Sequence, residues 1–159
     1  MKKALFAFLT TVCFLSADTI GPVEYKFPSE GWEMVNEVND EEMDGRLYGR
    51  ITEAGSEFFA VHLDHTSVPG LPTAKELQEG LQIPYPDQKV EVRILESDKT
   101  SLLYQWSISD EAELILHGWG RLFALNDGNV SLTYMTPESS LKDSPVWVKL
   151  LKEAKACAH

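Results

Sequence analysis

The sequence predicts an α+β fold, in which an antiparallel β-sheet of about seven or eight strands carries one inserted helix and one C-terminal helix. Most of the chain alternates apolar and polar residues or is rich in β-branched and aromatic residues, as half-buried strands are. One internal stretch has the start signals of a helix. A second stretch near the end of the sequence has apolar residues at helical spacing.

A secretory signal peptide is predicted over residues 1–17. It starts with two lysines, continues with an apolar run that ends at Leu15, and finishes with two small residues. The apolar run is shorter than the roughly 20 residues that a membrane-spanning helix requires. We therefore expect an exported protein, periplasmic or secreted, that consists of a single globular domain over residues 18–159.

Two alternatives for the leader stay open. Leu15 stands where a small residue is preferred before the cleavage site, which would leave an uncleaved anchor. Cys13 could carry a lipid, although Thr10, Thr11 and Val12 before it do not match a lipobox. Contact with a membrane is expected only in these two cases.

The net charge of -11 argues against a nucleic-acid partner, because nucleic-acid binding depends on lysine and arginine neutralising phosphates. An acidic surface favours solubility, and it also suits a basic protein partner or a divalent cation. After cleavage Cys157 would be the one remaining cysteine, which excludes an intrachain disulfide and cysteine zinc sites.

The first part of the predicted sheet precedes the inserted helix. Its four strand-like stretches are residues 23–27, 31–38, 45–52 and 57–65. The helix is predicted over residues 74–83. Thr73 and Glu76 have the spacing of a capping box, and prolines on both sides delimit the helix.

Four more strands and the final helix are predicted after residue 88. The strands are residues 89–96, 101–109, 113–125 and 129–135, and the last two are joined by the hairpin turn Asn126-Asp127-Gly128. The final helix is predicted to start with Ser144 as N-cap and Pro145 in its first turn, and to continue through residues 146–156. Its apolar face is expected to be Val146, Leu150, Leu151 and Ala154.

This order of elements resembles the PsbP-like superfamily. The resemblance covers residues 25–156 and rests on "FPSEGW" (27–32), "FFAVHLD" (58–64), "PTAKELQEGL" (72–81) and "VWVKLLKEA" (146–154). The superfamily contains the extrinsic protein of photosystem II, the Ran-binding Mog protein and bacterial DcrB-like envelope lipoproteins. The resemblance implies an α/β/α sandwich and an accessory or binding role, but it assigns no functional residue, because these proteins share no catalytic set.

A zinc site is one candidate for the stretch "FFAVHLDHT", with His62, Asp64 and His65 as ligands and His117 as a third nitrogen ligand. Side chains alternate along a strand, so His62 and Asp64 would face away from His65 unless the strand ends or bulges there. The favoured interpretation is a core strand in which Phe59, Val61 and Leu63 face inward.

A calcium loop is the second candidate. Asp40, Glu42 and Asp44 have the spacing of its first three ligands, and Gly45 follows at the turn position. Ile51 stands where a bidentate glutamate is required. The favoured interpretation is a solvated acidic hairpin.

The sequence contains neither a nucleophile elbow nor a glycine-rich phosphate loop, and we assign no catalytic, metal-ligating or cofactor-binding residue. The predicted function is that of an exported, non-enzymatic accessory or binding protein that recognises an envelope protein or a small ligand. The alternative is a zinc- or calcium-binding domain or, as a weaker alternative, a metal-dependent hydrolase.

Overall fold

The structure is a computed structural model that describes residues 16–27, 31–53, 55–67, 70–111, 113–137 and 144–157. The predicted signal peptide as far as Leu15, with Cys13, lies outside these ranges, as does His159. Strand β1 begins at Ser16, so the last two residues of the predicted leader, Ser16 and Ala17, belong to a strand. Cleavage of the leader stays a prediction.

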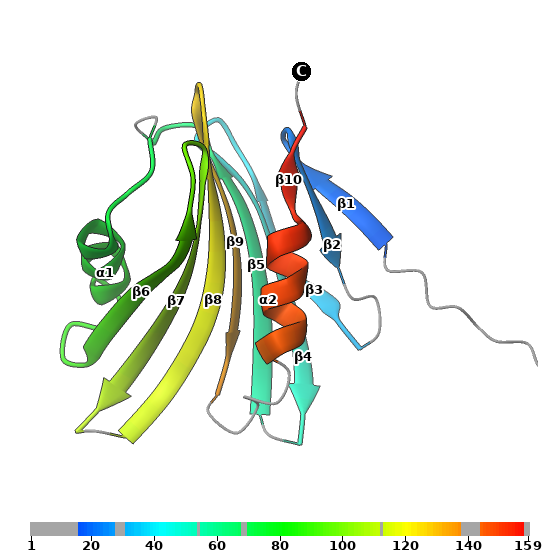
Figure 1. The fold of residues 1–159 in the computed structure, drawn as a ribbon. Helices are drawn as coiled ribbons and strands as arrows, with labels where there is room; N and C mark the ends of the chain where they lie inside the picture. The colour runs from blue at the N-terminus through cyan, green and yellow to red at the C-terminus, as the bar shows by residue number, and fades with distance from the viewer. Residues whose placement is uncertain are drawn as a thin grey trace, which may run out of the picture.

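The centre of the fold is a seven-stranded sheet in the order β3-β4-β5-β9-β8-β7-β6, in which all neighbouring strands are antiparallel (Figure 1). The predicted fold class is therefore confirmed. The strands are β3 (Glu33–Asn39), β4 (Met43–Thr52), β5 (Gly55–Asp64), β6 (Lys89–Ser97), β7 (Ser101–Asp110), β8 (Glu113–Leu125) and β9 (Gly128–Thr136).

A small second sheet was not expected from the sequence. It consists of β1 (Ser16–Ile20), β2 (Val23–Phe27) and β10 (Lys155–Ala156), with β2 in the middle. The C-terminal helix α2 (Ser144–Glu153) therefore ends earlier than predicted. After Ala154 the backbone pairs with β2 instead, and the N–H of Cys157 donates to the carbonyl oxygen of Pro22 at 2.7 Å.

Helix α2 and the small sheet lie on one face of the large sheet, and the larger core cluster lies between them (Figure 1). Trp147 stacks on Tyr134 of β9, with 4.2 Å between the ring centroids and 10° between the rings. The buried face of α2 is Trp147, Leu150, Leu151 and Ala154. The prediction that Val146 belongs to this face is wrong, because Val146 is 57% exposed. Trp147 takes its place on the buried face, four residues before Leu151 and thus one helical turn away.

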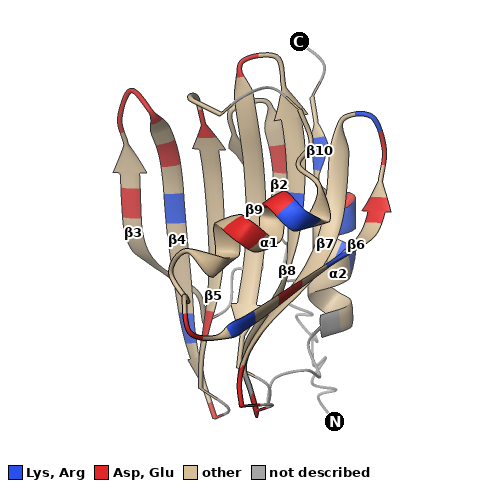
Figure 2. Cartoon of the chain, turned by 90° about the vertical axis from the view of Figure 1, so that its left-hand side faces the viewer, with Lys and Arg blue, Asp and Glu red and all other residues tan. Residues whose placement is uncertain are grey.

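Helix α1 (Ala74–Gln82) lies on the opposite face and contacts β6, so the two helices sandwich the sheet. Its predicted capping box is confirmed, because Thr73 and Glu76 exchange side-chain and backbone hydrogen bonds. Leu77 and Leu81 pack against a second core cluster built on β6 to β8. Figure 2, which views this face, shows that neither of the described helices lies in front of β3 and β4.

Candidate binding site

The β5 strand confirms the predicted alternation around the two histidines. Phe59, Val61 and Leu63 are buried in the core beneath α2. His62 is half-buried on the other face of the sheet, beside Gly45, and this burial lowers the pKa of its imidazole.

The strand ends at Asp64, and the residues after it form a tight turn. Oδ1 of Asp64 accepts hydrogen bonds from the backbone N–H groups of Thr66, at 2.8 Å, and Ser67, at 3.0 Å. Both bonds lower the pKa of the Asp64 carboxyl, and the bond from Thr66 has the larger effect. The exposed His65 lies with its Nε2 at 3.4 Å from Oδ2 of Asp44.

His117 lies far from these residues, because β9 separates β8 from β5. It is 2% exposed and packs edge-on against Trp119, on the face of the sheet opposite to His62. Throughout the described part of the chain, no three His, Cys, Asp or Glu side chains come together as a metal site would require.

In the acidic hairpin between β3 and β4, the first predicted calcium ligand, Asp40, accepts hydrogen bonds from the backbone of the same hairpin. Oδ1 of Asp40 accepts the N–H groups of Glu42 and Met43, each at 2.9 Å. Asp44 faces His65, and Glu42 is exposed. The three carboxylates thus have separate surroundings, as expected for a solvated hairpin.

A hollow of about 410 Å³ lies at the uncovered corner of the sheet, where β3, β4 and β5 meet; we call it the corner hollow. Its apolar lining comes from Val35 and Ile51, which are 59% and 89% exposed, and from the half-buried Phe58. The residue before Val35, Met34, is also exposed, at 54%, but it does not line the hollow. Clusters of exposed apolar side chains are a feature of interaction surfaces.

Two features of the backbone shape the corner hollow. The pairing of β3 with β4 shifts register between Met34 and Asn36, which is a β-bulge at Val35. Val35 lies across Gly49: a Cβ at Gly49 would be 2.8 Å from Cγ2 of Val35 and 3.5 Å from Cε1 of Phe58. The missing side chain at Gly49 therefore leaves room for Val35 to reach over β4 toward Phe58.

Arg50 connects the corner hollow to the core. Arg50 is one of the residues that line the hollow. Its guanidinium group forms an ion pair with Glu57, which is only 1% exposed, and lies 5.1 Å from the ring centroid of Trp32. Trp32 in turn packs edge-on against Trp147 of α2 at 5.3 Å. A buried carboxylate thus fixes the Arg50 side chain on the core side of β4, at the border of the corner hollow.

Strand β3 is also an edge of the sheet, and among the described residues it pairs with β4 alone. All of its side chains except Val38 are exposed. The strand and its hairpin are acidic, as Figure 2 shows, with Glu33, Glu37, Asp40, Glu41 and Glu42. Arg46 provides one counter-charge, with Nε at 3.4 Å from Oε1 of Glu37.

The sequence analysis missed the corner hollow, Arg50 and Glu57. One signal was present: Met34 and Val35 are adjacent apolar residues in an otherwise polar strand, and both cannot face the core if the strand is regular.

Comparisons with known proteins support the fold. No family model and no curated protein sequence matches the chain. Among solved structures, cyanobacterial PsbP (CyanoP) from Synechocystis sp. PCC 6803 is similar with a TM-score of 0.67, over 95% of this chain and 97% of that chain, at 10% sequence identity. None of the described helices is long and apolar enough to cross a membrane. The chain thus has a PsbP-like α+β fold, as the resemblance implied.

Proposed function

We propose that this protein is a non-enzymatic binding protein that docks an extended polypeptide segment of a partner against β3 and the corner hollow. One observation carries the proposal: an edge strand of the sheet lies directly beside an apolar hollow. An added strand would hydrogen-bond to the outer edge of β3, and its alternate side chains would enter the hollow. An accessory role agrees with the functions of the PsbP-like superfamily, and export rests on the predicted signal peptide.

The negative charges of β3 indicate which kind of partner segment can bind there. Two copies of this chain that paired β3 with β3 would bring Glu33 and Glu37 of both copies into one short interface, and like charges across strands are destabilising. A segment with lysine or arginine next to apolar residues matches both the carboxylates and the hollow. The net charge of -11 would also attract such a segment from a distance.

The test uses a fluorescent synthetic peptide that alternates lysine and valine, with a glutamate–valine peptide as the charge control. Binding to the purified full chain is measured by fluorescence anisotropy at two salt concentrations. We expect the lysine peptide to bind, more weakly at high salt. Ile51→Ser should weaken binding about tenfold, because full burial of an isoleucine contributes roughly 1.5 kcal/mol or more.

Ile83→Ser is the matched control, since Ile83 is 80% exposed at the end of α1, away from the corner hollow. It should leave the affinity unchanged. Equal weakening by both substitutions, or equal binding of the two peptides, would refute the proposal. Concentration-dependent dimers in sedimentation would show instead that a second copy occupies β3.

A further inference from the structure

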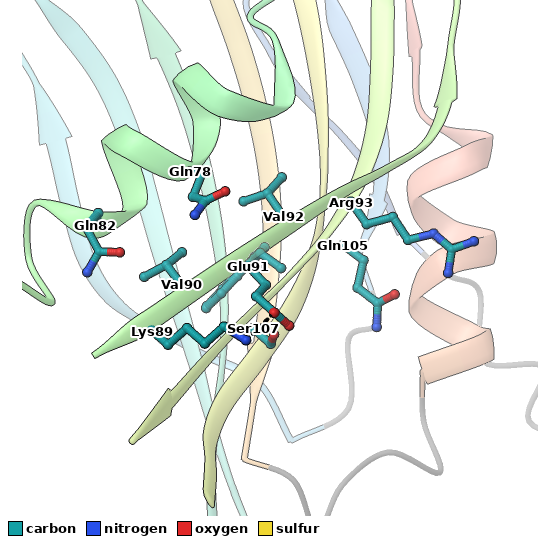
Figure 3. A pocket seen from close by; sticks show the side chains of 10 residues that line it. Gln78, Gln82, Lys89, Val90, Glu91, Val92, Arg93, Gln105 and Ser107 are labelled. Atoms are coloured by element: carbon teal, nitrogen blue, oxygen red, sulfur yellow. Dashed lines mark ion pairs between the residues drawn. The ribbon is translucent and has the colours of Figure 1, made fainter. Parts of the chain in front are cut away.

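A second and larger hollow, of about 620 Å³, lies along β6 at the opposite edge of the large sheet (Figure 3); we call it the β6 hollow. Figure 3 shows that Val90 and Val92 point toward α1, whereas Glu91 and Arg93 point to the other side. The hollow therefore extends around the edge strand β6, and the proposal below concerns its part that faces away from α1. The β6 hollow is independent of the binding function proposed for β3.

Arg93 distinguishes this hollow. Arg46 and Arg50 form ion pairs with carboxylates, and Arg121 donates to Oγ of Ser101 at 2.9 Å. Arg93 has no hydrogen bond or ion pair with any described residue, although the protein as a whole is strongly acidic. Its guanidinium group is exposed, and it offers five N–H donors.

Neutral hydrogen-bonding groups surround Arg93. Gln105 lies directly opposite Arg93 on β7, and Ser107 lies opposite Glu91, so these four side chains share one face of the β6–β7 pair. Gln105 and Ser107 are half-buried, and neither has a side-chain hydrogen bond with a described residue. The amide and the hydroxyl can each donate and accept a hydrogen bond.

We propose that the β6 hollow binds a small monocarboxylate that carries hydroxyl groups, such as an acidic sugar, with Arg93 as the carboxylate contact and Gln105 and Ser107 as hydroxyl contacts. The planar guanidinium group matches a carboxylate with two parallel hydrogen bonds. The two cations Lys89 and Arg93 and the one anion Glu91 leave a local charge of a single cation.

Glu91 disfavours ligands that carry more than one negative charge. It is held by Lys89, with Nζ at 2.6 Å from Oε1, and it stays in the β6 hollow as a negative group. A dianion such as sulfate would meet this carboxylate at close range, whereas a monoanion can contact Arg93 and leave Glu91 to Lys89.

The test is a titration of the isotope-labelled full chain with D-glucuronate, followed by NMR. D-Glucose is the uncharged control, and sulfate is the dianion control. We expect glucuronate to shift the side-chain amide signals of Gln105 and the backbone signals of β6, and glucose to bind at least tenfold more weakly, because it lacks the charge-assisted contact.

Arg93→Gln is the decisive variant, and it should weaken glucuronate binding about tenfold or more. Lys99→Gln is its matched control, because it removes the same charge from an exposed position in the turn between β6 and β7. Circular dichroism should show both variants folded, since both side chains are exposed. The proposal is overturned if glucuronate leaves Gln105 unshifted, if both variants bind equally, or if sulfate binds as tightly as glucuronate.

Discussion

Gly118 lies in the middle of β8, where the Trp106 side chain and the backbone of the neighbouring strand β9 leave no room for a methyl group. A Cβ at this position would be 2.2 Å from the carbonyl oxygen of Tyr134 and 2.7 Å from two ring atoms of Trp106. Close carbon–oxygen contacts between strands are normally about 3.3 Å or longer, so Gly118→Ala requires a shift of roughly 1 Å.

Neither obstacle can move easily. Tyr134 belongs to β9, which is paired on both sides, and Trp106 is 4% exposed beneath α1. Overpacking of a rigid core typically costs about 1–3 kcal/mol. We expect Gly118→Ala to lie at the upper end, with a loss of about 3 kcal/mol in the free energy of unfolding.

Urea denaturation followed by tryptophan fluorescence measures this loss as a lower midpoint at an unchanged slope. Gly80→Ala is the matched control, because no atom lies within 4 Å of a Cβ built on that helical glycine. It should instead stabilise the protein by about 0.5–1 kcal/mol. A loss below about 1 kcal/mol for Gly118→Ala would refute the close packing of Trp106 over β8.

Two further predictions concern carboxylates. Glu57→Gln should cost about 2 kcal/mol in urea denaturation; breaking a fully buried ion pair costs more, but Arg50 is 26% exposed and can regain water. A loss below about 0.5 kcal/mol would contradict a structural role for this pair. Asp98 accepts the N–H groups of Thr100 and Ser101, which lowers its pKa to about 2. Because the folded-state pKa is below the unfolded value, its stabilising contribution is present above about pH 4 and is lost as the pH falls through about 2. An NMR titration of the carboxyl that gives an ordinary pKa would contradict the Asp98 turn.

Local patterns predicted much of the fold. The capping box of α1, the hairpin turn before β9 and the inward face of β5 depend on residues close together in the sequence, and the structure has all three. The same alternation correctly separated His62 from the core side of β5. Strand periodicity was therefore sufficient to place the side chains of β5 on the correct faces.

The candidate sites could not be predicted, because they depend on the order of the strands. The corner hollow needs a bulge at Val35, a missing side chain at Gly49 and a ring at Phe58, on three strands. The β6 hollow needs Arg93 and Gln105 to be cross-strand partners. The end of α2 was missed for a similar reason: pairing with β2 overrides helical periodicity at Lys155.

The small sheet has a consequence for the way in which the chain folds. Glu24 in β2 pairs with Lys155 in β10, so this contact closes a loop that contains the entire large sheet. Such a contact is entropically expensive until the intervening strands are ordered. During synthesis, β2 leaves the ribosome long before β10, and one of its edges stays without a partner for that time. We expect the small sheet to form only after the large sheet has formed. Until then, the unpaired edge of β2 remains available to other strands.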